Sequence, residues 1–224
     1  MRAATPSDGV LRESADGEYD WDLPDGRTLS FRGSWLVRID YPGKAHLAFY
    51  YKRGRLARVT DEVGRVLALE YTEGRPGLEG YDTRTDVAAA GHLSRVILPD
   101  GRAIDYAYDN THNLTRVSFA DGTERRYHYE DALWPHQLTG ITDRTGERYA
   151  SWRYDEAGRA SFSGHANGVE RVALTYVDTA GGEAGSTVVT DSLGRTSRYD
   201  WRRAGDSGHA LLLGGEGPGC ATCP

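Results

Sequence analysis

The chain has 224 residues, with 27 lysines and arginines against 33 aspartates and glutamates, and a net charge of -6. This mild acidity argues against a nucleic-acid partner, because binding phosphates needs a basic face. Only 38% of the residues are hydrophobic, whereas 28 are glycine and 14 are tyrosine. We therefore expect thin sheets joined by short turns rather than a thick core.

The first 20 residues are polar and contain turn signals, and we interpret residues 1–20 as a lead-in or a partial repeat. They lack the apolar centre of a signal peptide, and no window of the sequence has the 18 or more consecutive apolar residues of a membrane span. Export directed by this segment alone is not expected. Because neither end closes a hydrophobic pattern, the chain is interpreted as a fragment of a longer polypeptide.

Hairpins follow in regular order after the lead-in. The first runs from Tyr19 to Phe31 around Asp25-Gly26, and Asp-Gly between alternating runs is the strongest short-range hairpin signal. The stretch 93–129 contains the clearest repeat, in which a leucine, a glycine and a tyrosine all recur 21 residues later: Leu93, Gly101 and Tyr108, then Leu114, Gly122 and Tyr129. No window shows the spacing of an amphipathic helix over three turns, so very little helix is expected.

The intervals predict an all-β fold, an array of stacked antiparallel hairpins over residues 21–205. Loops are predicted at about 73–92 and 179–185, and a glycine-rich tail at 206–224. The residues predicted to maintain the repeat are Tyr50, Gly54, Gly64, Tyr71, Gly101, Tyr108, Asp109, Gly122, Tyr129, Gly146, Tyr154, Asp155, Gly158, Gly194 and Trp201. The glycines fall in turns, where they adopt positive φ at little cost. His112 replaces one of them and is expected in the same left-handed region.

The segments Tyr154-Asp155-Glu156-Ala157-Gly158-Arg159 and Tyr108-Asp109-Asn110-Thr111-His112-Asn113-Leu114, set between Asp-Gly hairpins, resemble the YD repeats of the RHS family. The resemblance runs from about residue 25 to 201. It implies a long, curved, spiralling sheet that forms part of a hollow shell, as in bacterial RHS toxins, insecticidal toxin-complex subunits and the teneurins. The sequence departs from the family pattern at Tyr50 and Tyr129, which are followed by Tyr51 and Glu130 where the family favours Asp.

The resemblance also implies a function. It predicts a non-enzymatic structural segment of a bacterial RHS protein, whose partners are the rest of the shell and an enclosed C-terminal effector domain. No cofactor, nucleic acid or membrane insertion is expected. The parent protein is expected to be exported or displayed at the cell surface, and exposed edge strands are expected to favour self-association.

Other side chains were weighed for chemistry. Cys220 and Cys223 form a lone C-x-x-C, which suits half a zinc site or a redox pair, but no second ligand pair accompanies it, and a disulfide or free thiols are favoured. Carboxylates that could act as a glycosidase pair lie beside turns, where hydrogen bonds to the backbone explain them better: Asp105, Glu124, Asp143 and Asp155. No catalytic motif is present.

The aromatic residues leave two further readings open. Tyr71, Tyr108, Tyr129, Tyr154 and Trp201 are predicted to stack on one another from hairpin to hairpin. Alternatively, exposed rings and the inserted loops form a surface module that binds glycan or protein. A β-propeller, in which two hairpins make one blade, is disfavoured by the missing Trp-Asp signature and the uneven insertions.

Overall fold

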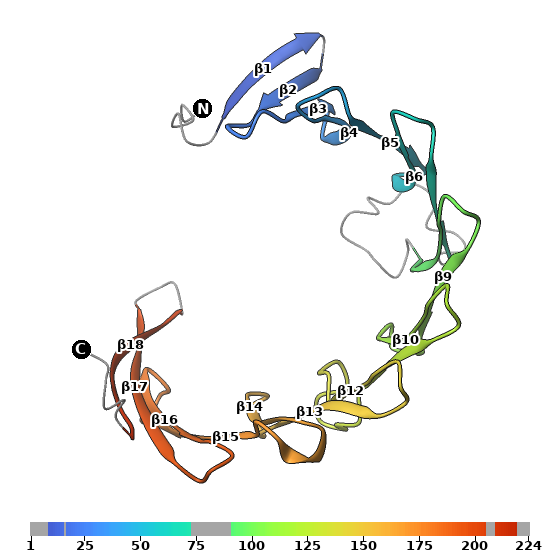
Figure 1. Ribbon diagram of the computed structural model, residues 1–224. Coiled ribbons are helices and arrows are strands. Elements are labelled where there is room, and N and C mark those ends of the chain that lie inside the picture. The colour runs from blue at the N-terminus through green and yellow to red at the C-terminus, as the bar shows by residue number, and fades with distance from the viewer. Residues whose placement is uncertain (1–8, 16, 73–90, 205–208, 219–224) are drawn as a thin grey trace. The chain divides into compact units, whose positions relative to one another are not determined.

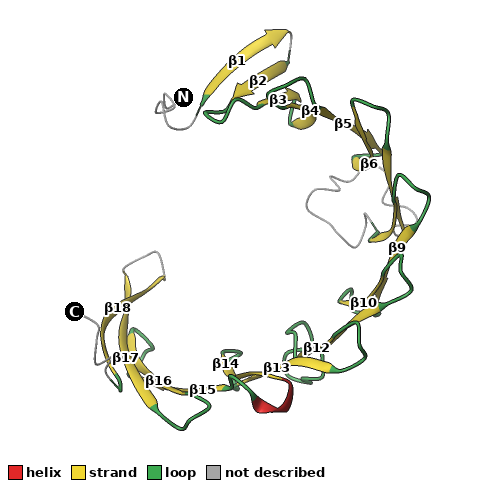
Figure 2. Ribbon diagram, in the orientation of Figure 1, coloured by secondary structure: helices red, strands yellow, loops and turns green. Residues whose placement is uncertain are grey.

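The computed structural model describes residues 9–15, 17–72, 91–204 and 209–218. These residues form 18 strands and a single 3-10 turn, η1 (Ala166–Gly168), so the predicted all-β fold is confirmed (Figures 1 and 2). Within the described ranges, no helix has the length and apolar character that crossing a bilayer requires.

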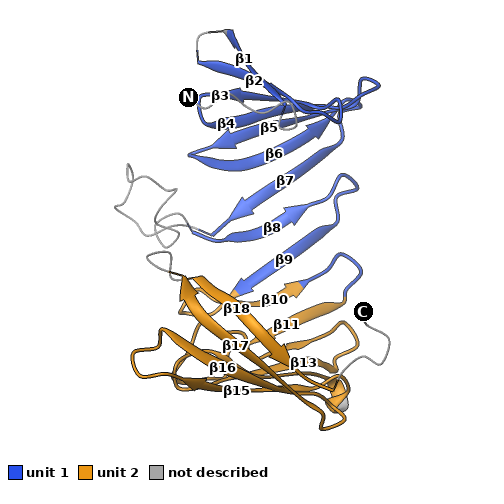
Figure 3. Ribbon diagram, turned by 90° about the vertical axis from the view of Figure 1, so that its left-hand side faces the viewer, with its two compact units in different colours: residues 1–107, 118–122 blue, residues 108–117, 123–224 orange. Residues whose placement is uncertain are grey.

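The chain divides into two compact units (Figure 3). The first comprises residues 1–107 and 118–122, and in it each strand pairs antiparallel with the next along the chain. Its strands are β1 (Val10–Ala15), β2 (Glu18–Asp22), β3 (Thr28–Arg32), β4 (Trp35–Asp40), β5 (His46–Lys52), β6 (Arg55–Asp61), β7 (Val66–Tyr71), β8 (Leu93–Ile97) and β9 (Ala103–Tyr108), the last residue of which belongs to the second unit.

The second unit comprises residues 108–117 and 123–224, and antiparallel pairing of chain neighbours again runs from β11 to β18. Its strands are β10 (Leu114–Ser118), whose last residue belongs to the first unit, β11 (Glu124–His128), β12 (Gly140–Thr142), β13 (Arg148–Tyr154), β14 (Ala160–His165), β15 (Val172–Asp178), β16 (Ala184–Thr190), β17 (Thr196–Ala204) and β18 (His209–Glu216).

The hydrophobic core is as thin as the composition predicts. Among the described residues only Val96, Val117 and Ala150 are buried hydrophobic side chains, and none of the large side chains is completely buried. Backbone pairing between strands and side-chain contacts across neighbouring strands therefore contribute much of the cohesion of each sheet.

Strands extend beyond the predicted limits of the array. β1 lies in the segment interpreted as a lead-in, and β18 lies in the segment predicted as a tail. The loop predicted at 179–185 ends earlier, because Ala184 already begins β16. Pairing with β2 and β17 orders β1 and β18 although their side chains are exposed, which a search for alternating hydrophobicity misses. Of the predicted loop at 73–92, residues 73–90 lie outside the described residues.

A β-bulge recurs opposite an aromatic residue in several strands. Tyr50 pairs with Arg58 but Tyr51 pairs with Leu56, so one residue of β6 is extra. The same shift occurs where the aromatic-to-partner pairs are Phe31 with Leu36, Tyr71 with Leu93, Tyr154 with Ala160 and Trp201 with Leu212. Because a bulge bends its strand and increases the local twist, repeated bulges curve a sheet in a regular way.

Candidate functional site

The most regular chemical feature is a hydrogen bond from a tyrosine hydroxyl to a backbone carbonyl of the preceding hairpin. We call each such bond a tyrosine bridge. Four such bridges, with their O–O distances, are Tyr51 to Leu36 (2.8 Å), Tyr71 to Leu56 (2.9 Å), Tyr154 to Leu138 (2.7 Å) and Tyr176 to Ala160 (2.7 Å). Each of these hydroxyls therefore ties its own strand to a residue 15 or 16 positions earlier in the chain.

The bridges follow from the bulges. Leu56 pairs with Tyr51 at a bulge, where the regular ladder is interrupted, and its carbonyl accepts the Tyr71 hydroxyl. A carbonyl freed from a ladder needs another donor, which the phenol supplies. Partial burial raises the pKa of the Tyr51, Tyr71, Tyr154 and Tyr176 hydroxyls. The bridge hydroxyls therefore stay protonated as donors at neutral pH.

For Tyr51 and Tyr71, the spacing of the strands argues against the predicted stacking of equivalent rings. Tyr51 and Tyr71 lie on β5 and β7, with β6 between them. Alternate strands are about 10 Å apart, whereas ring pairs need about 4.5–7 Å between centroids. The rings pack against intervening strands instead: Trp35 lies 4.7 Å from the Tyr51 ring, and Arg55 lies over the Tyr71 ring at 5.2 Å.

The position equivalent to Tyr71 is occupied by Tyr51, whereas the sequence intervals were counted from Tyr50. Tyr51 makes the bridge and sits at the bulge. Tyr50 is 45% exposed, and its ring lies under the guanidinium of Arg58 at 4.2 Å. Because Tyr50 and Tyr51 are adjacent, the sequence alone does not say which of them corresponds to Tyr71. The bulge at Tyr51 shows that it is Tyr51.

Aspartates organise the turns. In Asp-x-x-Gly-Arg, one carboxylate oxygen accepts the backbone N–H groups two and four residues on, and the other accepts the arginine Nε. At Asp155 these distances are 3.0 Å from Ala157, 2.8 Å from Arg159 and 2.8 Å for Nε. Asp61 with Arg65 and Asp191 with Arg195 repeat the arrangement. The backbone N–H of Arg195 is the largest of several hydrogen bonds that lower the pKa of Asp191.

The turn from Asp109 to Asn113 is built the same way around a histidine. His112 has φ 72°, as predicted for the residue that replaces the turn glycine. The Asp109 carboxylate accepts the hydroxyl of Thr111 and the side-chain amide of Asn113, as well as both backbone N–H groups. Partial burial alone would raise the pKa of Asp109, but these hydrogen bonds outweigh it and set the pKa at about 2.

An extended turn, residues 131–137, connects two neighbouring turns. Toward the Asp109 turn, the Asn113 amide donates to the Pro135 carbonyl at 2.8 Å, and its oxygen lies 2.9 Å from Nδ1 of His136. Toward the next turn, Trp134 Nε1 donates to the Asp155 carbonyl and Gln137 Nε2 to the Gly158 carbonyl, each at 3.0 Å. In the sequence, Leu138 lies nine residues after Tyr129, whereas Leu114 lies six after Tyr108, and this longer interval marks the extended turn. The hydrogen bonds that connect it to the turns on either side have no signal in the sequence.

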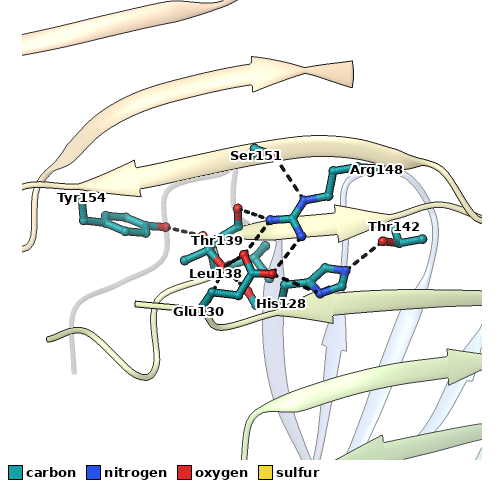
Figure 4. Close-up of polar contacts among 8 residues, drawn as sticks. All are labelled: His128, Glu130, Leu138, Thr139, Thr142, Arg148, Ser151 and Tyr154. Atoms are coloured by element: carbon teal, nitrogen blue, oxygen red, sulfur yellow. Dashed lines mark hydrogen bonds and ion pairs between the residues drawn. The ribbon is translucent and has the colours of Figure 1, made fainter. Parts of the chain in front are cut away.

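Beside it lies a polar cluster centred on Arg148 and Glu130 (Figure 4). Arg148 donates to both carboxylate oxygens of Glu130 at 3.2 and 3.0 Å and to the Thr139 carbonyl at 3.0 Å. This ion pair is the largest cause that lowers the pKa of Glu130. Burial and then the Arg148 charge lower the pKa of His128, whose Nε2 lies 2.8 Å from the Thr142 hydroxyl. The cluster spans β11, β12 and β13 at the shortest strand of the unit.

A cavity of about 300 Å³ lies on β15 to β18. Tyr176 and Trp201 contribute rings, and the Arg159 guanidinium covers the Tyr176 ring at 4.1 Å while its Nη1 contacts both oxygens of Asp178. The full lining is Arg159, Tyr176, Asp178, Gly182, Thr187, Trp201, Arg203 and Ala210. Aromatic walls with a few polar groups are typical of a small binding site, and this volume is at the lower limit for one.

The described repeat geometry agrees with the comparison to known families: the model of the RHS repeat matches residues 89–124. The chain therefore contains a segment that matches the RHS repeat. No curated protein matches the chain.

Two solved structures are similar to this chain. One is the crystal structure of TcdB2-TccC3-TEV, at 11% identity and TM-score 0.36, covering 87% of this chain and 14% of the other. The second is the Photorhabdus luminescens Tc holotoxin pore with a mutation in TccC3, at 16% identity and TM-score 0.38, covering 95% of this chain and 12% of the other. The chain thus spans about one seventh or less of the length of each.

The structure places the described residues predicted to maintain the repeat as follows. The predicted glycines all have positive φ, between 73° and 87°: Gly54, Gly64, Gly101, Gly122, Gly146, Gly158 and Gly194. Tyr108 ends β9, Tyr129 follows β11, and Trp201 lines the cavity. Cys220 and Cys223 lie outside the described residues. No group of three or more metal-binding side chains occurs within the described part of the chain.

The carboxylates considered for glycosidase chemistry are all engaged in local structure. Asp105 accepts Arg95 Nε at 2.6 Å, and Glu124 accepts Arg126 Nε at 2.6 Å. Asp143 accepts the hydroxyl and the backbone N–H of Thr145, and Asp155 forms the turn described above. Asp143 and Asp155 therefore form the predicted hydrogen bonds to the turn backbone, whereas Asp105 and Glu124 form ion pairs with arginines on strands instead.

Proposed function

We propose that this chain is a non-enzymatic structural segment of a bacterial RHS protein, contributing to a β-shell that encapsulates a toxin or effector polypeptide. The observation that supports this best is the repeated tyrosine bridge, because recurrent tyrosine hydroxyls bond the backbone of an earlier hairpin and so hold consecutive hairpins together. The aspartate and arginine side chains of the turns are engaged locally as well, each pair holding its own turn. Side chains committed to neighbouring hairpins build a continuous sheet.

The partners under this proposal are the remainder of the shell and an enclosed C-terminal effector domain. The mechanism is mechanical: a continuous hydrogen-bonded sheet excludes proteases from the enclosed polypeptide until it is delivered. The parent protein would be exported or displayed at the cell surface, since an effector acts on another cell.

Limited proteolysis of the parent protein tests the proposal. Two bridges are removed by Tyr71→Phe and Tyr154→Phe, and the matched control is Tyr50→Phe, whose hydroxyl makes no bridge. We expect the effector segment to resist protease in the wild type and the control but to be cut faster in the double variant. Equal cutting of the effector in all three proteins would contradict encapsulation by this sheet.

The cavity on β15 to β18 supports a second candidate, a surface module that binds glycan or protein. Its Trp201 and Tyr176 rings lie beside the turn at residues 179–183, as the aromatic-and-loop alternative requires. A ligand screen by glycan and peptide arrays tests it, with Trp201→Ala as the variant and Tyr199→Ala, 41% exposed and outside the cavity lining, as the control. No binding on either array, or binding that Trp201→Ala leaves intact, would exclude this cavity as the site.

A further inference from the structure

The cavity on β15 to β18 is small and belongs to neighbouring strands of the second unit (Figure 3). Its volume of about 300 Å³ is at the lower limit for sites that bind small molecules. It therefore suits one ring-sized unit and is too small for a peptide segment with several side chains. Of the described lining residues only Ala210 lies on β18, so the cavity does not depend on what pairs with the outer edge of that strand.

The Arg159 guanidinium is held in place from three sides. Its Nε donates to Asp155 at 2.8 Å, and its Nη1 donates to both oxygens of Asp178 at 2.9 and 2.7 Å. It also lies over the Tyr176 ring at 4.1 Å, and the Tyr176 hydroxyl is itself fixed by its bridge to Ala160. A ligand that binds Arg159 and Asp178 therefore has to order little side-chain motion, which favours its affinity.

The Trp201 indole lies close to strand β16 because residue 185 of that strand is glycine. A Cβ at Gly185 would be 2.8 Å from Cζ2 of Trp201 and 2.5 Å from the Val177 carbonyl oxygen. The φ of Gly185 lies outside the left-handed region, so the lack of space, and not the backbone conformation, requires glycine. Since the Arg159 guanidinium already covers one face of the Tyr176 ring, Trp201 provides the ring on which a ligand can stack.

Arg203 fixes the turn at residues 179–183, which borders the cavity through Gly182. The Arg203 backbone N–H donates to the Glu183 carbonyl at 2.7 Å, and its Nε donates to the Gly182 carbonyl at 3.0 Å. These two bonds hold the turn against β17. The wall that the turn forms therefore keeps its shape when a ligand enters.

The charges around the cavity balance. Arg159 and Arg203 are the cations in the lining and Asp178 is the anion, and Asp155 pairs with Arg159 just outside it. Neither an anionic nor a cationic ligand therefore gains from attraction to the cavity as a whole. A neutral ligand with several hydroxyl groups is favoured instead, because hydroxyls both donate to carboxylates and accept from guanidinium groups.

We propose that the cavity binds one neutral hexopyranose unit of a glycan. One face of the sugar ring, with its slightly positive C–H groups, stacks on the negative face of the Trp201 indole. Two adjacent hydroxyls bond to the Asp178 carboxylate, which accepts, and to the Arg159 guanidinium, which donates. The inference rests on the second function proposed above, binding at this cavity, and narrows its ligands from glycans and proteins to neutral sugars.

Saturation-transfer NMR on the 224-residue chain tests the proposal, with the methyl glycosides of glucose, galactose and mannose as probes. We expect saturation of the ring C–H protons of at least one glycoside and a weaker signal from its methyl group, because the ring faces the indole. No saturation of any of the three would overturn the proposal, and so would a signal confined to the methyl group.

Variants of the indole and of the carboxylate locate the binding. Trp201→Ala should abolish it, and Trp201→Phe, which keeps a ring, should only weaken it. The matched control is Tyr199→Ala, 41% exposed and outside the lining, which should leave binding unchanged. Asp178→Asn should raise the Kd by about tenfold, because an ionised acceptor forms the stronger hydrogen bond. Circular dichroism shows whether each variant remains folded, and binding that survives Trp201→Ala in a folded protein would overturn the proposal.

A charged probe separates this inference from the second function as a whole. Methyl glucuronide has the glucose ring with a carboxylate, and we expect it to bind no more tightly than the methyl glucoside. Tighter binding of the glucuronide would overturn the assignment to neutral sugars but keep the cavity as a binding site. A peptide whose binding needs Trp201, while no glycoside binds, would do the same. If neither sugars nor peptides bind, the inference and the second function both fail.

Discussion

Replacing Gly140 with alanine tests whether the Arg148 cluster stabilises the second unit. Gly140 is buried in β12, and its φ lies outside the left-handed region, so backbone conformation does not require glycine there. The reason is steric: a Cβ at this position would overlap the guanidinium of Arg148. Alanine therefore displaces Arg148 from Glu130 and from the Thr139 carbonyl.

The magnitude follows from the contacts that are lost. The side chains of Arg148 and Glu130 are 35% and 59% exposed, so their ion pair contributes at most about 1 kcal/mol. The Thr139 carbonyl belongs to a buried residue, and losing its hydrogen bond to Arg148 costs about 1 kcal/mol. Replacing glycine with alanine stabilises the fold by about 0.5 kcal/mol, because it lowers the conformational entropy of the unfolded chain. The net loss is about 1–2 kcal/mol, or roughly 2–8 °C in melting temperature.

Urea unfolding of four proteins measures this loss: wild type, Gly140→Ala, Arg148→Ala and the double variant. If the cost of alanine acts through Arg148, it disappears in the Arg148→Ala background, where the added methyl meets no guanidinium. Gly140→Ala then becomes neutral or slightly stabilising. An equal cost in both backgrounds would refute the reasoning and assign the loss to the backbone of β12.

Three further predictions concern the turns and bridges. The pKa of Asp109 is about 2 in the fold, below its ordinary value of 3.8. Its contribution to the free energy of unfolding is therefore complete above pH 3.8 and lost as the pH falls through about 2. Asp109→Asn should remove this part of the acid dependence, which a pH series of urea midpoints measures. At His112, valine should cost about 1–2 kcal/mol more than glycine in thermal unfolding, because φ is 72°; equal melting temperatures would contradict this. Tyr71→Phe should cost about 1 kcal/mol and Tyr50→Phe close to nothing, because only the first removes a bridge, and a reversed order in urea unfolding would exclude that role.

The turns were predictable from sequence because their chemistry is local. The Asp155 carboxylate accepts backbone N–H groups two and four residues later, and Gly158 has positive φ within the same five residues. The same short sequence therefore produces the same turn wherever it occurs. His112 was predictable for the same reason, since it stands where the repeat requires positive φ. These features depend on no distant partner, and the repeat interval is enough to place them.

The tyrosine bridges were not predictable, because they depend on bulges that change the register by one residue. Nothing in the letters around Leu56 marks the extra residue of β6, and without it Tyr50 and Tyr51 are equally good candidates. The approach of Arg148 over Gly140 depends equally on tertiary placement. β18 was missed because backbone pairing orders it without a buried face, and for the same reason the sequence left β1 open between a lead-in and a partial repeat.

The tyrosine bridges also have a direction along the chain. In all four, the acceptor carbonyl precedes the donor hydroxyl, as Leu36 precedes Tyr51 and Leu138 precedes Tyr154. A chain that emerges amino end first, from a ribosome or through a narrow pore, has therefore already formed each acceptor when the matching tyrosine arrives. Every new hairpin can dock on a finished one and needs nothing still to come, so assembly can keep pace with emergence. When the chain is unfolded from its carboxyl end, the tyrosine bridges break one at a time, the last one in the sequence first.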